Sequence, residues 1–117
     1  MWYESAIRNS SDTSEIISDV MVPAESPWFV GHFPGNPVLP GVAQLNMVYE
    51  LIGKALGRAV IVREISRVRF KQMVLPDEHL AVFAAPRPEQ QGVYAFRITK
   101  HDKVVCSGNM TISAANR

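Results

Sequence analysis

Prolines recur through the segment from Pro23 to Pro40, and this pattern limits the chain's fold more than any other feature. Each proline fixes its own φ angle and lacks an amide hydrogen, so neither a helix nor a central strand can run through the segment. The same segment is rich in apolar side chains, among them Trp28, Phe29 and Phe33. We therefore expect an ordered loop packed against the body of the protein, and long ordered loops of this kind often carry function.

The segment that follows, from Pro40 to about Leu56, has the pattern of a helix. Proline suits the first turn because its missing amide hydrogen would be unpaired there anyway, and Gly57 suits the end. Apolar residues surround most of the circumference, which predicts burial on several sides. A narrow polar line remains, and it includes Asn46 and Glu50. This line is a candidate functional surface, although an ordinary solvated stripe would give the same pattern.

The remaining segments alternate apolar and polar residues, as strands do. The predicted strands cover residues 15–22, 60–74, 79–85, 92–99 and 104–113. Residues 1–14 are mostly polar, and we expect a loop or a frayed terminus there. One helix precedes a meander of about four strands, which predicts an α+β fold with an antiparallel sheet wrapped around the helix. The length of 117 residues fits a single domain, residues 1–117.

Composition and charge argue against several classes of protein. The 12 basic and 11 acidic residues leave a net charge of +1, too small for bulk nucleic-acid binding. Cys106 is the only cysteine, so no intrachain disulfide forms, and the scattered histidines lack the spacing of a structural zinc site. The start of the chain lacks the features of a secretory signal, and no apolar stretch is long enough to span a membrane. We expect a cytoplasmic protein without a metal or an organic cofactor.

His32 is the only histidine within the proline-rich loop, and it lies between Gly31 and Gly35. Glycines let the backbone approach a ligand closely, and the prolines around them stiffen the loop. Gly41 begins the helix, where amide groups are free to bind a carbonyl oxygen. A base beside such an oxyanion site fits removal of a proton next to a thioester carbonyl. A lone loop histidine often serves only as a structural hydrogen-bonding group, so spacing alone leaves both interpretations open.

A family resemblance supports the catalytic interpretation. The run WFVGHFPGNPVLPGV, residues 28–42, resembles without gaps the signature of bacterial β-hydroxyacyl-acyl-carrier-protein dehydratases of fatty-acid synthesis. Weaker similarity extends through residues 68–80 and 103–111, so the likeness covers roughly residues 15–114. Val42-Ala43-Gln44 is also similar to a dehydratase-like branch found in aryl-polyene and related lipid pathways.

The resemblance implies a hotdog fold, in which two subunits pair edge to edge and form active sites at their interface. It implies that His32 removes the α-proton and that the amide of Gly41, or of its neighbour Val42, holds the thioester carbonyl. It also implies that a helix carboxylate from the other subunit protonates the departing hydroxyl group. The remaining residues expected to contact the substrate are Phe33, Gly35 and Glu50.

Asn46 departs from the family pattern, which places a glutamate or aspartate 14 residues after the histidine. Asparagine cannot supply a proton near neutral pH, and loss of a general acid costs about 10²–10⁴-fold in rate. Four explanations remain open. Asn46 orients a water that donates the proton, Glu50 one turn later partly substitutes, or the domain has lost dehydration and keeps thioester binding. A fourth is that Asn46 was engineered in place of a natural carboxylate.

Other functions and partners also remain open. In a hotdog thioesterase, a polar helix residue such as Asn46 would position the attacking water. A non-catalytic subunit would bind the acyl carrier protein and complete a heteromeric dehydratase. The acyl group is expected to ride on acyl carrier protein or coenzyme A, and the assembly to be a homodimer or a higher homo-oligomer. Basic residues between Lys54 and Lys71 are compatible with an acidic carrier, but an ordinary solvent-facing strand explains them as well.

Overall fold

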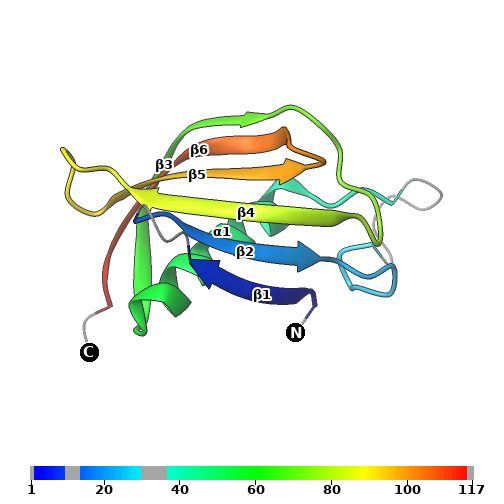
Figure 1. Cartoon of the computed structure of the whole chain (residues 1–117), viewed down its shortest axis with the longest axis horizontal. Coiled ribbons are helices and arrows are strands. Elements are labelled where there is room, and N and C mark those ends of the chain that lie inside the picture. The colour runs from blue at the N-terminus through cyan, green and yellow to red at the C-terminus, as the bar shows by residue number, and fades with distance from the viewer. Residues whose placement is uncertain (1, 10–13, 30–36, 116–117) are drawn as a thin grey trace.

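The computed structural model describes residues 2–9, 14–29 and 37–115, which form one helix and six strands. The helix, α1, spans Gly41–Leu56. The strands are β1 (Glu4–Asn9), β2 (Ile16–Met21), β3 (Val60–Phe70), β4 (His79–Pro86), β5 (Val93–Lys100) and β6 (Lys103–Ala114). All six strands join one antiparallel sheet, and α1 packs across one face of it (Figure 1). The predicted α+β class with an antiparallel sheet is confirmed.

The strands follow the order β1-β2-β4-β5-β6-β3 across the sheet (Figure 1). β4, β5 and β6 form a meander, and His101 and Asp102 turn the chain between β5 and β6 with φ angles of 51° and 64°, as a tight hairpin turn requires. β3 pairs with β6 at the edge of the sheet. The predicted meander of four consecutive strands is therefore wrong for β3, which does not lie beside β4. β2 lies beside β4 instead, because Val20 and Leu80 pair there and are both buried.

The expectation of a loop across residues 1–14 is also wrong, because β1 forms at Glu4–Asn9. β1 has little apolar character of its own, and it is held by its pairing with β2 along its whole length. The guanidinium of Arg8 reinforces the pair by donating to the carboxylate of Asp19 at 2.7 Å and 3.1 Å. A strand stabilised by its neighbour more than by its own alternation leaves little signal in the sequence.

Both ends of α1 lie where the sequence predicts them. Pro40 is the N-cap, and Gly57 adopts the left-handed conformation with φ 69° and donates its amide to the Gly53 carbonyl at 2.9 Å. One face of α1 is buried against the sheet and forms the centre of the core. The predicted burial on several sides holds only in part within this chain, since Val42 is 63% exposed on the opposite face.

The core draws on both the sheet and the helix. Cys106 is fully buried in β6, and burial raises the pKa of its thiol to about 11. Cys106 is therefore a small core residue, and a thiol with so high a pKa is a poor nucleophile at neutral pH. Among the described residues, no helix is long and apolar enough to cross a membrane.

Candidate active site

Three residues of the predicted site, His32, Phe33 and Gly35, lie outside the described residues. The structure describes the two flanks of their segment, residues 22–29 before it and 37–40 after it. It also describes the start of α1 and the helix positions of Asn46 and Glu50. The geometry of the site is therefore built from the flanks and the helix.

The start of α1 offers amide groups close to one flank. The amides of Ala43 and Gln44 both donate to the Pro40 carbonyl, at 3.1 Å and 3.2 Å. The amides of Gly41 and Val42 precede these bonds, at positions where a helix leaves its amides without an intrahelical acceptor. A carbonyl oxygen could bind there, which is compatible with the role predicted for Gly41 and Val42.

Gly41 has a further structural reason to be glycine. A Cβ atom at this position would lie 2.6 Å from the Phe70 ring, well inside van der Waals contact. The aromatic ring from the end of β3 therefore packs directly on the helix backbone beside the candidate oxyanion position. The sequence singled out Gly41 for ligand approach, but Phe70 was missed, because no local signal places the end of β3 against this helix.

Asn46 lies on the outward face of α1, in a mostly apolar hollow of about 290 Å³ between the helix and the sheet. The other residues that line it are Val42, Leu45, Tyr49, Val62, Ile65 and Met110. The Tyr49 hydroxyl donates to the Val60 carbonyl at 3.1 Å, so its polar end is already paired within the chain. Among the described residues, Asn46 therefore supplies a polar side chain that a molecule bound in this hollow can contact.

Glu50 follows Asn46 by one turn, but its carboxylate points toward the N-terminal segment. The Tyr3 hydroxyl donates a hydrogen bond to Glu50 Oε1. Tyr3 is 5% exposed, and burial raises its pKa, with the hydrogen bond to Glu50 and the nearby negative charge adding to the shift. Glu50 is not among the residues that line the hollow around Asn46. The structure thus places these two predicted residues on different flanks of the helix.

Aromatic side chains surround the Tyr3 contact. Trp2 packs edge-on against Tyr3 with ring centroids 4.4 Å apart, and against Trp28 at 5.9 Å. Trp28 belongs to the flank that precedes residues 30–36. No role was predicted for Trp2 and Tyr3, and their aromatic side chains are the one sequence signal that this polar terminal segment packs against the core.

Gln44, from the motif Val42-Ala43-Gln44, is a buried polar residue for which no separate role was predicted. It is 3% exposed, and its Nε2 donates to the Leu39 carbonyl at 3.3 Å. Its Oε1 has no hydrogen-bond partner within the part of the chain that the structure describes. Gln44 therefore ties the helix to the flank that contains Leu39, and it keeps a buried acceptor that a water could satisfy.

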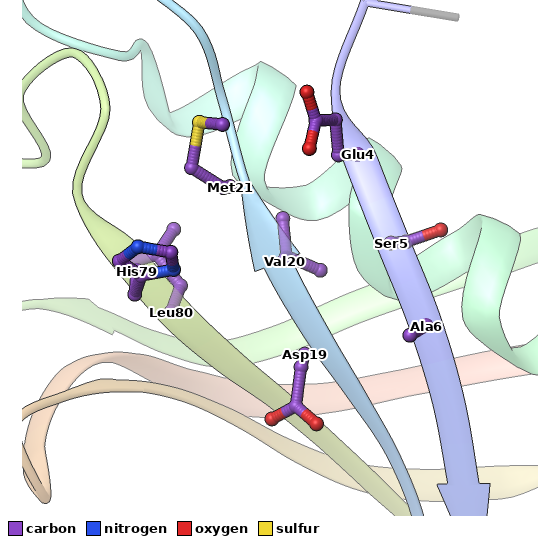
Figure 2. A pocket seen from close by; sticks show the side chains of 8 residues that line it. All are labelled: Glu4, Ser5, Ala6, Asp19, Val20, Met21, His79 and Leu80. Atoms are coloured by element: carbon purple, nitrogen blue, oxygen red, sulfur yellow. The ribbon is translucent and has the colours of Figure 1, made fainter.

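A separate hollow of about 380 Å³ lies over β1, β2 and β4 (Figure 2). Its lining residues are Glu4, Ser5, Ala6, Asp19, Val20, Met21, His79 and Leu80. The Asp19 carboxylate accepts a hydrogen bond from Arg8, and this bond lowers the pKa of the Asp19 carboxyl. No group of three or more metal-binding side chains occurs in the described ranges. None of the predicted site residues that the structure describes lines this hollow, so the hollow around Asn46 remains the candidate.

Comparison with known proteins identifies the family of this chain. The family model described as ApeI-like, ApeI dehydratase, matches residues 7–109, from β1 into β6. This chain belongs to the ApeI-like dehydratase family. The predicted membership of a hydroxyacyl-thioester dehydratase family is confirmed.

Relatives of this ApeI-like protein include enzymes named 3-hydroxyacyl-acyl-carrier-protein dehydratase FabZ. The FabZ of Streptococcus mutans is 34% identical over 112 residues, which cover 87% of this chain and 79% of the relative. The FabZ of Chloroflexus aggregans is 29% identical over 109 residues, covering 86% of this chain and 76% of the relative.

A solved structure agrees with the fold over almost the whole chain. The dehydratase heterocomplex ApeI:P from Xenorhabdus doucetiae matches with a TM-score of 0.83 and 25% identity, covering 96% of this chain and 98% of that one. The hotdog-like arrangement of one helix against a six-stranded sheet is thereby confirmed. The roles of His32, Gly41, Val42, Asn46 and Glu50 in this ApeI-like protein stay predictions.

Proposed function

We propose that this protein catalyses the reversible dehydration of a 3-hydroxyacyl thioester to a trans-2-enoyl thioester. The observation that carries the proposal is the match of the ApeI-like dehydratase model across residues 7–109. The relatives named as acyl-carrier-protein dehydratases support a substrate carried on acyl carrier protein, with coenzyme A as the second carrier to test. The reaction moves a proton and a hydroxyl group, so it calls for a base and a proton donor.

In this mechanism His32 takes the proton from the α-carbon, and the electron pair moves onto the thioester carbonyl oxygen. The amide of Gly41 or Val42 donates to that oxygen and stabilises its charge. When the carbonyl re-forms, the bond between C3 and the hydroxyl oxygen breaks. The departing hydroxide takes a proton from a water held by Asn46, and the proton on His32 neutralises the hydroxide left behind. The products are the enoyl thioester and water.

The described geometry supports this assignment in one respect. Val42 stands beside the helix start and also lines the hollow that contains Asn46. Asn46 follows Val42 by four residues, which is a rise of about 6 Å along a helix. The carbonyl and the C3 hydroxyl group of one substrate can therefore reach the helix amides and Asn46 together.

The exposed apolar side chains beside the site support the presence of a second subunit. Val42 and Ile65 border the hollow around Asn46, and they are 63% and 39% exposed within the single chain. Burial of such apolar side chains favours association. We propose a homodimer that covers this surface.

A non-catalytic subunit of a heteromeric dehydratase is the second candidate function. Asn46 favours it, because asparagine is not a proton donor at neutral pH. The heterocomplex in which the ApeI:P relative was solved adds to the case.

The experiment that tests the proposal follows the ultraviolet absorbance of a crotonyl thioester during incubation with the purified protein. Wild type is compared with His32→Asn and with His101→Asn as the matched control. His101 is an exposed turn residue with φ 51°, and asparagine tolerates that conformation. We expect the enoyl band to decay with wild type and His101→Asn, and to persist with His32→Asn.

Other outcomes separate the alternatives. Release of free thiol instead of hydration would identify a thioesterase. An unchanged enoyl band with every protein, together with binding of acyl carrier protein, would favour the non-catalytic subunit. Equal decay with His32→Asn would remove His32 from the mechanism.

A further inference from the structure

One turn of the chain, residues 73–78, contacts both flanks of the segment that contains His32. The Asp77 amide donates to the Val22 carbonyl at 2.9 Å, and Asp77 Oδ1 accepts from the Ala24 amide at 3.1 Å. The Leu39 amide donates to the Val74 carbonyl at 2.9 Å. The flank before residues 30–36 and the flank after them are thus bonded to the same turn. We call residues 73–78 together with Lys100 the turn clamp.

The turn clamp is itself fixed to the sheet. Glu78 Oε1 accepts from the Leu75 amide at 2.7 Å and from Lys100 Nζ at 3.2 Å. Lys100 lies at the end of β5, and its Nζ also donates to the Met73 carbonyl at 3.0 Å. The side chains of Lys100 and Glu78 are only 16% and 26% exposed, so water screens this ion pair less than a surface pair. The sheet therefore holds the turn, and the turn holds both flanks.

Asp77 adopts a left-handed backbone conformation at the centre of the clamp. Its φ angle is 67°, which aspartate tolerates better than most residues other than glycine. Asp102 has a similar φ angle of 64° in an exposed hairpin turn, so the conformation alone does not distinguish Asp77. Asp77 differs because its amide and its carboxylate are both bonded to one flank.

We infer that Asp77, Glu78 and Lys100 are positioning residues for the proposed dehydration. They fix the separation and direction of the two flanks, and hence the points at which the His32 segment leaves the body and returns to it. This inference rests on the proposed function for its catalytic consequence. Displacement of a catalytic group by about 1 Å costs up to 10²-fold in rate, so loss of the clamp should lower kcat more than it raises KM.

The test compares two substitutions of Asp77 with a matched control. Asp77→Gly removes the acceptor for the Ala24 amide and relieves the left-handed φ at the same time, so any loss is not caused by backbone strain. Asp77→Asn keeps both an acceptor and tolerance of that conformation. Asp102→Gly is the control, because Asp102 is an exposed turn residue with φ 64° that makes no hydrogen bond to the described residues of either flank.

We expect kcat for the crotonyl thioester to fall about tenfold to a hundredfold in Asp77→Gly, with Asp77→Asn and Asp102→Gly close to wild type. Amide hydrogen exchange is measured on the same proteins. The amides of the non-proline residues within 22–29 and 37–40 should exchange faster in Asp77→Gly alone. Wild-type kcat and wild-type exchange in Asp77→Gly would overturn the inference.

The exchange measurement separates this inference from the proposed function. If wild type turns over no thioester, the proposed function fails, while faster exchange of the flanks in Asp77→Gly still supports the clamp. If Asp77→Gly does not fold, Lys100→Met takes its place, since it keeps the aliphatic stem and removes the donors to Met73 and Glu78. Lys103→Met, an exposed neighbour in β6, is then the control.

Discussion

The two flanks of α1, which are its sides toward β1 and toward β3, differ in what covers them. On the flank toward β1, Glu50 is bonded to Tyr3, which is almost fully buried. On the flank toward β3, Asn46 borders an apolar hollow in which Val42 and Ile65 stay exposed. One flank is closed by the chain's own N-terminal segment, and the other is left open.

This difference indicates which flank is available to other molecules. The closed flank uses a polar pair to hold β1 in place, and its carboxylate is already engaged. The open flank combines apolar surface with Asn46, whose side chain has no hydrogen bond among the described residues. It also contains an edge strand, β3, whose register with β6 shifts at two bulges or irregularities, between Val62 and Glu64 and between Ser66 and Arg69. Edge strands with bulges resist indiscriminate strand addition, so a partner here must match a particular shape.

Asn46→Glu is the substitution with the largest expected effect. If only the proton donor is missing on the open flank, kcat for hydration of a crotonyl thioester should rise by about 10²–10⁴-fold. The measurement is the initial rate of loss of the enoyl absorbance. The gain must disappear in the double variant with His32→Asn. A loss of activity in Glu50→Gln would instead place the proton donor on the closed flank. The closed flank would then have a catalytic role, contrary to the difference described above.

Ile65→Glu should weaken association by placing a charge on the open flank. Ile65 is 39% exposed in the single chain, so the dimer buries only this part of its apolar surface, and the added carboxylate must also be removed from water. We expect the dimer Kd to rise about tenfold. Sedimentation velocity over a range of concentrations measures this change. Ile7→Glu is the matched control, because Ile7 is 44% exposed and lies in β1 on the other side of the helix. Equal weakening by both variants would show that the two flanks do not differ in this respect.

Tyr3→Phe should have the smallest effect, a loss of about 1 kcal/mol in the free energy of unfolding near neutral pH. The pH dependence is more specific. The pKa of Tyr3 is raised in the folded state from its ordinary value of 10.0, so its stabilisation is complete below pH 10. Above pH 10 the unfolded chain loses this proton first, and stability falls as pH rises.

Urea denaturation of wild type and Tyr3→Phe between pH 8 and about pH 11 measures the difference, across the ordinary range of tyrosine ionisation. The decline with pH should be shallower in Tyr3→Phe. Cys106 also ionises in this range, but it is present in both proteins and its contribution cancels. Identical slopes would mean that the closed flank does not depend on the Tyr3 hydroxyl.

Local signals in the sequence were sufficient for the helix and for several strands. Pro40 and Gly57 mark the ends of α1 through their own backbone preferences, and the turn at His101 and Asp102 separates β5 from β6. The placement of β1 and of β3 could not be predicted in the same way. Both depend on pairing with strands that are distant in the sequence, and alternation within a strand does not specify its neighbour.

The candidate site was likewise predictable where local signals sufficed and not where it depends on contacts between distant parts of the chain. The family signature identified the segment from residue 28 to residue 42, and spacing from His32 identified Asn46. The Tyr3–Glu50 bond joins residues 47 positions apart, so nothing local points to it. The turn clamp likewise depends on contacts among three separate parts of the chain.

The contact between Gly41 and Phe70 joins two positions that are distant in the sequence. A methyl group on residue 41 would lie 2.6 Å from the end of the Phe70 ring, so alanine there requires this half-exposed ring to turn outward. Residues 41 and 70 therefore share one volume beside the helix start, and a larger side chain at residue 41 fits only if the ring at residue 70 gives up part of that space.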